Sequence, residues 1–382
     1  MPNRDPKFTV MIPTREREGT LPAAIASALV DPRDDLEVLV VDNFGEGGVR
    51  TIVEAIADRR VRYVRAPRRL PMSENWSFGL GHVRGRYVFI LGDDDAMMPD
   101  GLARVDRCLR ETGQPIVAWR KETSYYWKDA ILTARRNMLH VDLARVGEEA
   151  VVASKDLLAV YYASEVSFAD LPSLYTSFVE RSILERIKDR AGQYFVTSTP
   201  DVESGVSCCY FVDSFARLAR GASLSGTSGS SIGTSAVFPN LSSAARDKWA
   251  LEHDPAAYAV HESLVPSTSL EMHIANVNIR ARLALFPDDD RYDVRIDRVI
   301  GSILGNINRN PDRYEELLDD AQRLAAKYRL ALKPEAVPPK KPRDEVRRKG
   351  LSPSGLLAID GDVAGFHDAA AAARVASALL PD

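Results

Sequence analysis

The feature that most constrains the fold is a pair of apolar runs in the first hundred residues, each followed at once by acidic residues. The stretch "LEVLVVD" (36–42) carries four consecutive apolar residues and ends in Asp. The stretch "RYVFIL" (86–91) leads through one glycine into Asp93, Asp94 and Asp95. Strands that read as near-continuous apolar runs are buried on both faces, as in parallel sheets covered by helices.

The segments around these two runs alternate between strand and helix patterns. "KFTVMIPT" (7–14) and "VRYVRA" (61–66) predict two further strands, and apolar spacing predicts helices over 20–30, about 49–58 and about 73–83. Strands separated by helices of this length form right-handed βαβ units. We therefore predict an α/β fold with a mostly parallel sheet flanked by helices.

The chain has 382 residues, which is too long for one small core. Beyond the first third, the pattern is mixed to about residue 240 and mainly helical after it, and a tract rich in Pro and basic residues precedes a last helix. The predicted units are an α/β domain over 1–240 with halves 1–110 and 111–240, a helical region over 241–332, an extended linker over 333–350 and a C-terminal helical segment over 351–382.

Composition narrows the classes of protein. A net charge of -4 gives no overall reason for binding nucleic acid, and no apolar run approaches 18 residues, so we expect a cytoplasmic protein. The three cysteines have no metal or disulfide spacing and are expected to be reduced. The basic residues of the linker leave open a peripheral contact with anionic lipid at the inner face of the membrane, although a solvated linker explains them as well.

Three adjacent carboxylates after a buried strand need a compensating partner, because like charges repel and burial disfavours ionisation. Mg²⁺ or Mn²⁺ would satisfy them, since these cations take one or two carboxylates and fill their shell with water and phosphate. In the simpler alternative, Asp95 caps a helix that starts at "AMMP". A second triplet, Asp288 to Asp290, follows a helix and is expected to be a solvated turn.

Polar loops follow all four predicted strands, in the order "PTRER", "DNFGEGG", "PRRLPMSEN" and "GDDDAMMP". In open α/β sheets, ligands bind in the crevice outside the carboxyl ends of the strands. We therefore expect these four loops to converge on one site. Arg65, at the end of the third strand, and Arg68 and Arg69 in the loop after it could meet a phosphate or could be ordinary solvated surface.

The segments "VMIPTRERE", "VLVVDN" and "SENWSFGLGHVRGRYVFILGDDDAMMPDGL" resemble, in order and spacing, the nucleotide-sugar-binding half of family 2 glycosyltransferases with the GT-A fold. The resemblance covers about residues 7–105. It implies an inverting enzyme that moves a sugar from a nucleoside-diphosphate sugar, expected to be a UDP-sugar, to an acceptor hydroxyl with Mn²⁺ or Mg²⁺ as cofactor. The acceptor would be a saccharide, a lipid-linked saccharide or a small molecule.

The resemblance also assigns roles to individual residues. It places Pro13, Thr14 and Arg15 against the nucleobase, Asp42 on the base or ribose, Asn75 at the family's Asn position, Asp93 on the ribose or metal, and Asp94 and Asp95 at the metal. The sequence departs from the family pattern at Gly92, where many members have the first Asp. This departure leaves open which two of the three carboxylates bind the metal.

Inverting transfer also needs a general base for the acceptor hydroxyl. The family places this carboxylate well after the metal loop, where "TPDVES" offers Asp201, with Glu203 two residues on. We predict Asp201 as the base. The alternative is that Asp201 only caps the helix that starts there, and Asp170 is a lesser candidate.

Two other features keep more than one interpretation. Tyr125, Tyr126 and Trp127 could stack on sugar rings or belong to the core. The small-residue segment 221–235 could be a flap over the substrates or a plain connection.

Two rival functions stay open, namely a sugar-phosphate nucleotidyltransferase and a non-catalytic nucleotide-binding protein of the same fold. A homo-oligomer is also left open.

Overall fold

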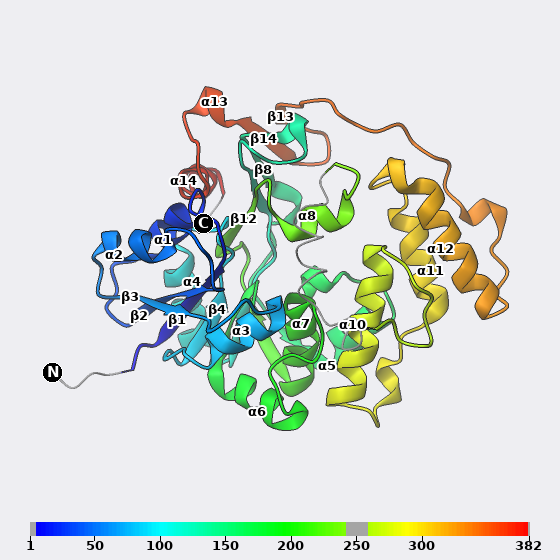
Figure 1. The fold of residues 1–382 in the computed structure, drawn as a ribbon, viewed down its shortest axis with the longest axis horizontal. Coiled ribbons are helices and arrows are strands. Elements are labelled where there is room, and N and C mark those ends of the chain that lie inside the picture. Colours follow the sequence, from blue (N-terminus) through cyan, green and yellow to red (C-terminus); the bar gives the residue numbers. More distant parts are fainter. Residues whose placement is uncertain (1–4, 242–258, 381–382) are drawn as a thin grey trace.

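The computed structural model describes residues 5–241 and 259–380, and it confirms the α/β class (Figure 1). Its larger sheet has eight strands in the order β3-β2-β1-β4-β10-β6-β11-β9. Their bounds, in chain order, are β1 Phe8–Thr14, β2 Leu36–Asp42, β3 Val61–Arg65, β4 Tyr87–Ile90, β6 Ile116–Ala118, β9 Ala150–Ala153, β10 Ser177–Glu180 and β11 Ser214–Arg217.

The first four strands are parallel, as predicted. Strand β1 pairs in parallel with β2 and β4, and β2 pairs in parallel with β3. The register sets Thr14 beside Asp42 at the carboxyl ends of β1 and β2. Beyond β4 the sheet is mixed, because β10 pairs antiparallel with both β4 and β6. The loops that were expected to converge therefore leave from one edge of the parallel half.

Helices cover both faces of this sheet, because its strands alternate their side chains between two cores. Along β1, Met11 joins one core with residues of the α3 and α7 side, whereas Val10 and Ile12 join the other with residues of α1 and α4. The helices of the first part are α1 Leu21–Ala28, α2 Val49–Ile56, α3 Met72–Leu80 and α4 Gly101–Thr112. Each predicted helix between the first four strands is confirmed to within about three residues at either end.

The second sheet has six strands in the order β13-β14-β8-β7-β12-β5. Strand β5 (Ala96–Met97) occupies "AM" of the expected helix start, so that prediction is wrong and α4 begins only at Gly101. The segment 221–235 holds β12 (Ser223–Thr227), which pairs antiparallel with β5. The other strands are β7 Thr123–Tyr126, β8 Met138–Asp142, β13 Gly350–Leu351 and β14 Leu356–Asp360.

The end of the described chain returns to the first part. Strand β14 pairs antiparallel with β8, and helix α14 (Ala369–Leu379) lies beside α1 and β5 (Figure 1). The sequence predicted the last helix but neither of the two strands before it. These strands extend the sheet that carries β5 and β12, the strands next to the acidic triplet.

The remaining helices belong to the second part of the α/β domain and to the helical region. Their bounds are α5 Ser154–Tyr162, α6 Arg181–Ala191, α7 Pro200–Phe211, α8 Ile232–Val237, α10 Leu270–Leu285, α11 Ile296–Asn306 and α12 Tyr314–Lys327. Helices α10 to α12 share a core of their own at the end of the molecule away from β1 (Figure 1). The predicted change of domain at 240–250 falls mostly outside the described residues.

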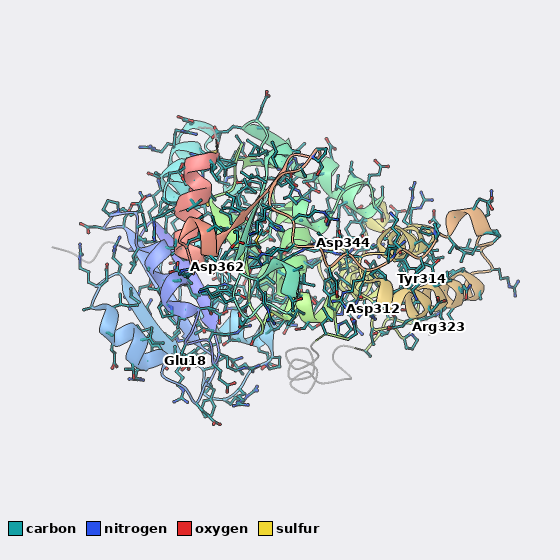
Figure 2. The ribbon with its side chains drawn as sticks, turned by 90° about the horizontal axis from the view of Figure 1, so that it is seen from above. Glu18, Asp312, Tyr314, Arg323, Asp344 and Asp362 are labelled. Atoms are coloured by element: carbon teal, nitrogen blue, oxygen red, sulfur yellow. The ribbon has the colours of Figure 1, made fainter. Side chains whose placement is uncertain are left out.

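The basic arm, residues 333–350, is extended apart from a short 3-10 turn at Pro334–Ala336. It runs between the helical region, marked by Asp312, and the α13 segment (Gly361–Ala364), marked by Asp362 (Figure 2). Arg343 pairs with Asp312 at 3.1 Å, and Lys349 pairs with Asp360 at 2.6 Å. These ion pairs reduce the free positive charge that the arm offers to lipid.

None of the helices among residues 5–241 and 259–380 combines the length and the apolarity needed to cross a bilayer.

Candidate active site

The acidic triplet follows β4 and is buried in the structure. Asp93, Asp94 and Asp95 expose only 8%, 7% and 0% of their surface. Such burial requires compensating charges or donors. Each of the three carboxylates meets a different environment, and the differences decide what each can do.

Asp95 is neutralised by the protein itself. Lys121 Nζ lies 3.1 Å from Asp95 Oδ2, and the backbone N–H of Gly226 donates to Oδ1 at 2.6 Å. Asp95 does not cap a helix, because the strand β5 follows it. With both oxygens engaged by donors, Asp95 is not favoured as a metal ligand, and its role is to fasten β12 and Lys121 to the end of β4.

Asp94 is held through one oxygen. Its Oδ2 accepts hydrogen bonds from Ser228 N at 3.2 Å, Ser228 Oγ at 2.7 Å and Ser231 Oγ at 2.6 Å, and Arg17 Nη1 lies 3.9 Å away. Its Oδ1 takes part in none of the hydrogen bonds seen in the described part of the chain. A carboxylate fixed through one oxygen can offer the other to a cation.

Asp93 is the least compensated of the three. Burial raises its pKa to about 6, the charge of Arg17 opposes this rise, and the charge of Asp94 adds to it. An incoming cation would favour the ionised form. Asp93 and Asp94 therefore fit a Mg²⁺ or Mn²⁺ that takes two carboxylates and completes its shell from water and phosphate. Among the described residues no larger group of His, Cys, Asp and Glu forms a metal cage.

The departure at Gly92 has a steric cause. A Cβ at this position would lie 2.6 Å from Tyr175 Oη and 3.0 Å from Asp95 Oδ2. Tyr175 fills the space where the family's first Asp side chain would stand, and Lys121 Nζ sits 3.6 Å from the centroid of its ring. The missing carboxylate is thus replaced by a phenol packed beside a lysine.

This packing predicts the result of a double-mutant cycle. We expect Gly92→Ala to lower the free energy of unfolding by about 1–3 kcal/mol, because it overpacks the site. In a Tyr175→Phe background the same change should cost clearly less, since the clashing atom is the hydroxyl oxygen. Urea unfolding of the four proteins measures the coupling, and equal costs in the two backgrounds would contradict this explanation.

Asp42 is anchored where the resemblance places the nucleotide. Its Oδ2 accepts from Tyr63 Oη at 2.6 Å and its Oδ1 from Gly45 N at 2.9 Å, while Arg65 Nε lies 3.8 Å away. Burial and Asp42 together raise the pKa of Tyr63 to about 12, so this phenol stays a donor. Thr14 lies beside Asp42 in the sheet register, with the half-buried Pro13 and Arg15 on either side of it.

The other arginines of the third loop are paired with carboxylates. Arg68 Nη2 lies 2.9 Å from Glu74 Oε2, and Arg69 Nη2 lies 3.1 Å from Glu16 Oε1. These pairs favour the interpretation of both arginines as surface residues.

Buried polar atoms of three predicted site residues lack a hydrogen-bond partner of good geometry. Asn75 Oδ1 and Asp201 Oδ1 are covered and make no hydrogen bond within the described residues, and Thr14 Oγ1 is covered with only the Asp93 carboxylate near it. Leaving such a group unsatisfied costs about 1–3 kcal/mol. The three residues come from β1, α3 and α7, and α3 packs against both β1 and α7. Poorly paired atoms on three converging elements are what a site for a polar ligand provides.

Asp201 is the second residue of α7 and does not cap it. Thr199 holds the N-cap position, and Asp201 Oδ1 is one of the unpaired atoms. Burial raises the pKa of Asp201, and hydrogen bonds from the backbone N–H groups of Val202 and Asp201, followed by the charge of Lys121, partly offset the rise. Burial raises the pKa of Tyr175, and the charges of Asp95, Asp94 and Asp201 add to the rise, so Asp201 and the triplet all lie near this side chain. A carboxylate with a raised pKa suits a general base.

The other two candidate carboxylates are structural. Glu203 accepts from Val196 N at 2.7 Å and from Thr197 N and Oγ1 at 2.8 and 2.6 Å. Asp170 accepts from Arg120 Nε at 2.8 Å and from the backbone N–H of Ser167 in a capping box. Both side chains hold loops in place, and the lesser prediction for Asp170 is not supported.

Glu203 predicts a pH dependence of stability. Burial raises its pKa from 4.5 to about 7 in the folded protein. The folded state therefore binds the proton more tightly, and this stabilisation is lost as the pH rises from about 4.5 through 7. We expect the free energy of unfolding to fall by about 2 kcal/mol more in the wild type than in Glu203→Gln over this range. Parallel curves against pH for the two proteins would contradict the assignment.

The aromatic cluster belongs to the core. Tyr125 and Trp127 are buried, and Tyr125 Oη donates to Asn137 Oδ1 at 2.8 Å. Trp127 Nε1 donates to the backbone carbonyl of Asp94 at 2.8 Å. Of the two interpretations, the core one holds for these two side chains. Trp127 supports the site because its hydrogen bond fixes the backbone of the triplet at Asp94.

Sequence reasoning missed several residues that shape the site. They are Arg17, Lys121, Tyr175, Ser228 and Ser231. Arg17 stands in the recognised segment "PTRERE" and could have been found there, whereas the other four lie in segments with no recognisable motif.

The first third of the sequence is similar to a known protein family. Residues 9–129 match the profile described as "Glycosyl transferase family 2". Over these residues the chain is similar to glycosyl transferase family 2. The matched family 2 segment contains β1 to β7, and with them Asp42, Asn75 and the acidic triplet. The resemblance stated from the motifs is confirmed for this segment.

A curated relative matches over a similar stretch. The succinoglycan biosynthesis protein ExoO of Rhizobium meliloti (strain 1021) is 33% identical over 100 residues. The alignment covers 26% of this chain and 29% of the relative. It therefore concerns the family 2 segment and leaves most of both proteins unmatched.

Solved structures of TarS from S. aureus superpose on most of the chain. The TarS 1–349 complex with UDP-GlcNAc has a TM-score of 0.49 and 13% identity, and the match covers 85% of this chain and 91% of that one. A longer TarS structure has a TM-score of 0.45 and 15% identity, with 84% and 53% covered. Structural similarity with TM-scores below 0.5 carries no inference about ligands. The similarity to family 2 rests on the sequence match.

Proposed function

We propose that the protein is an inverting glycosyltransferase that transfers a sugar from a nucleoside-diphosphate sugar to an acceptor hydroxyl. The observation that carries the proposal is the pair of unpaired buried oxygens on Asn75 and Asp201 together with a partly compensated acidic triplet. Asn75 and the triplet lie in the segment that is similar to family 2. We propose a UDP-sugar as donor, with the base near Pro13, Thr14, Arg15 and Asp42.

Asp93 and Asp94 would hold the divalent cation. When bound, Mn²⁺ or Mg²⁺ supplies Lewis-acid stabilisation of the charge that develops on the leaving diphosphate. Arg17 and Lys121 keep the three carboxylates compatible with an anionic ligand, because each places a cation beside the triplet. Asn75 offers an unpaired buried oxygen to the donor from the side of α3.

Asp201 would act as the general base. The acceptor oxygen attacks the anomeric carbon from the face opposite the diphosphate, and its proton passes to the Asp201 carboxylate. The carbon–oxygen bond to the diphosphate breaks, and the nucleoside diphosphate leaves with the electron pair. One displacement of this kind inverts the anomeric configuration. A saccharide, a lipid-linked saccharide or a small molecule with a free hydroxyl would be the acceptor.

The product that is released separates this proposal from its rivals. Incubation with UDP-sugars, Mn²⁺ and a saccharide-containing extract should release UDP, with the sugar appearing on the acceptor. Release of pyrophosphate from a sugar phosphate and UTP would identify a nucleotidyltransferase instead. Tight Mn²⁺-dependent binding of UDP with no transfer in any extract would identify a non-catalytic binding protein.

A further inference from the structure

A short connection between β12 and α8 closes over Asp94. A Cβ on Gly226 would lie 1.7 Å from the carbonyl oxygen of Asp94, so the strand touches the backbone of the triplet. Two residues on, Ser228 begins the turn that brings both serine hydroxyls onto Asp94 Oδ2. The position of this turn therefore decides how Asp94 is oriented.

The turn is rigidly joined to α8 (Ile232–Val237). Ser231 occupies the N-cap position of the helix, and the N–H of Ser235 donates to the Ser231 carbonyl at 3.1 Å. At the other end the N–H of Phe238 donates to the Thr234 carbonyl at 2.9 Å. A displacement of α8 would therefore move the serine hydroxyls away from Asp94.

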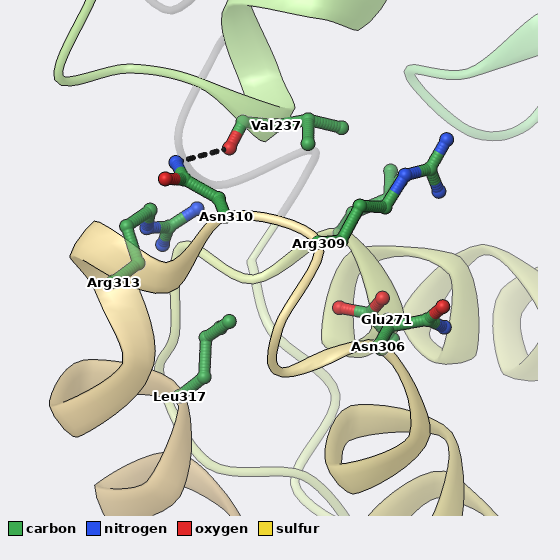
Figure 3. Close-up of a pocket in the computed structure, with 8 residues that line it drawn as sticks. Val237, Glu271, Asn306, Arg309, Asn310, Arg313 and Leu317 are labelled. Atoms are coloured by element: carbon green, nitrogen blue, oxygen red, sulfur yellow. Dashed lines mark hydrogen bonds between the residues drawn. The ribbon is translucent and has the colours of Figure 1, made fainter. Parts of the chain in front are cut away.

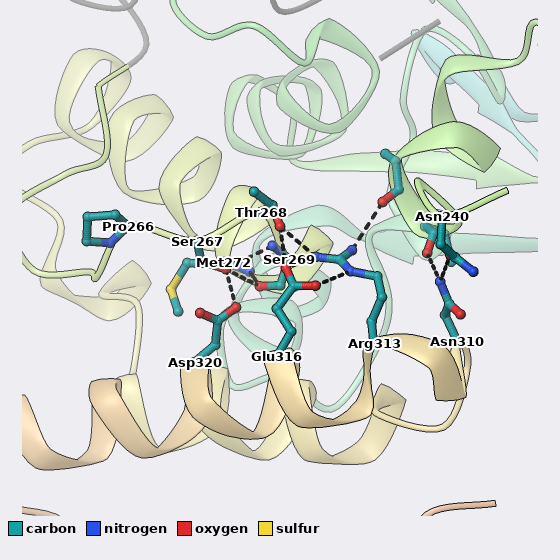
Figure 4. Close-up of polar contacts among 12 residues, drawn as sticks. Asn240, Pro266, Ser267, Thr268, Ser269, Met272, Asn310, Arg313, Glu316 and Asp320 are labelled. Carbon is teal, nitrogen blue, oxygen red and sulfur yellow. Dashed lines mark hydrogen bonds and ion pairs between the residues drawn. The ribbon is translucent and has the colours of Figure 1, made fainter. Parts of the chain in front are cut away.

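The C-terminal end of α8 is held by hydrogen bonds from the helical region. Asn310, in the turn between α11 and α12, donates through Nδ2 to the Val237 carbonyl at 2.8 Å (Figure 3). The same Nδ2 donates to Asn240 Oδ1 at 2.8 Å (Figure 4). Arg313 Nη1 reaches the Ala236 carbonyl at 3.5 Å (Figure 4). These contacts satisfy carbonyls at the helix C-terminus, which lack partners within the helix.

Arg313 is itself held in place. It is 6% exposed, its Nε and Nη2 donate to the Glu316 carboxylate at 2.8 and 2.5 Å, and Nη2 also donates to Thr268 Oγ1 at 2.6 Å (Figure 4). Thr268 lies two residues before α10 and Glu316 lies in α12, so two segments of the helical region hold this guanidinium. A guanidinium fixed on several sides loses little freedom when it makes a further contact.

We propose that Asn310 and Arg313 are positioning residues of the donor site. They fix the end of α8 and thereby keep Ser228 and Ser231 on Asp94 Oδ2, so that Oδ1 remains directed to the cation and diphosphate. This inference rests on the proposed function. Groups that orient a metal-binding carboxylate typically change metal affinity 10–100-fold when removed. The helical region then has a defined task in a site about 215 residues earlier in the sequence.

The test is a titration of Mn²⁺ in the presence of UDP, followed by electron paramagnetic resonance. We expect Asn310→Ala to weaken Mn²⁺ binding about tenfold while the protein stays folded, which thermal unfolding without ligands checks. The matched control is Arg309→Ala, because Arg309 lies in the same turn and its side chain makes no hydrogen bond within the described residues. Figure 3 shows Arg309 beside Asn310 but away from the Val237 carbonyl. Unchanged binding in Asn310→Ala would overturn the proposal.

A double-mutant cycle separates positioning from a general loss of structure. If Asn310 acts through Ser231, the double variant should bind Mn²⁺ no more weakly than Ser231→Ala alone. Additive losses would overturn the proposal.

Failure of the proposed function is recognised separately. If the wild type binds neither Mn²⁺ nor UDP, the proposed function is wrong. Hydrogen exchange over residues 228–238 then still tests whether Asn310 and Arg313 fix the end of α8. Exchange should be faster in Asn310→Ala than in Arg309→Ala, and equal rates would overturn it.

Discussion

Asp94→Asn is expected to lower the rate of Mn²⁺-dependent sugar transfer by roughly 10³-fold, because it removes a charged ligand whose metal supplies several kcal/mol of stabilisation to the transition state. The amide keeps a carbonyl oxygen for Ser228 and Ser231, so the fold should persist. The assay measures release of the nucleoside diphosphate at saturating donor, with and without added Mn²⁺.

The second triplet supplies the control. Asp288 is exposed beside the 3-10 turn Asp290–Tyr292, as the sequence predicted, and Asp288→Asn removes a carboxylate of the same kind. Its transfer rate should equal that of the wild type. Full metal-dependent transfer by Asp94→Asn would contradict the assignment of the metal to this carboxylate.

Asp201→Asn is expected to reduce transfer by roughly 10²- to 10⁴-fold while the affinity for the donor is retained. An amide cannot take the acceptor proton, but it occupies the same volume at the start of α7. Isothermal titration with UDP and Mn²⁺ reports binding, and product formation reports the chemical step.

Asp170→Asn is the matched control for the base. Its carboxylate is bound by Arg120 and Ser167, so the change should affect the local cap and leave the chemical step intact. A large loss of transfer in Asp170→Asn with none in Asp201→Asn would reverse the two assignments.

The parallel half of the fold could be predicted because its signals are local. Both ends of the strand over 36–42 were predicted, because the apolar run that defines the strand begins and ends at these residues. The short strands β5, β12, β13 and β14 could not be placed in this way. Strands β5, β12 and β14 pair with remote segments, as with Leu224 beside Ala96, whereas β13 pairs with the nearby β14. Strands of two to five residues are also too short to show a period in the sequence.

The same distinction applies to the site. Asp42 and the triplet were found because each ends an apolar strand. Lys121 reads in the sequence as an ordinary surface lysine, and only the packing of Tyr175 and Asp95 around it makes it part of the site.

The anomaly at Gly92 was visible in the sequence, but its cause was not. Tyr175, whose hydroxyl excludes a side chain there, follows more than 80 residues later.

We propose that a nucleoside diphosphate binds at the carboxyl ends of β1, β2 and β4 with a divalent cation on Asp93 and Asp94. A thermal-shift screen of nucleoside diphosphates and their sugars, with and without Mn²⁺, tests it most directly. We expect UDP to raise the unfolding temperature of the wild type in the presence of Mn²⁺. Without Mn²⁺ the rise should be much smaller. Unchanged unfolding temperatures with every nucleotide, with and without Mn²⁺, would contradict it.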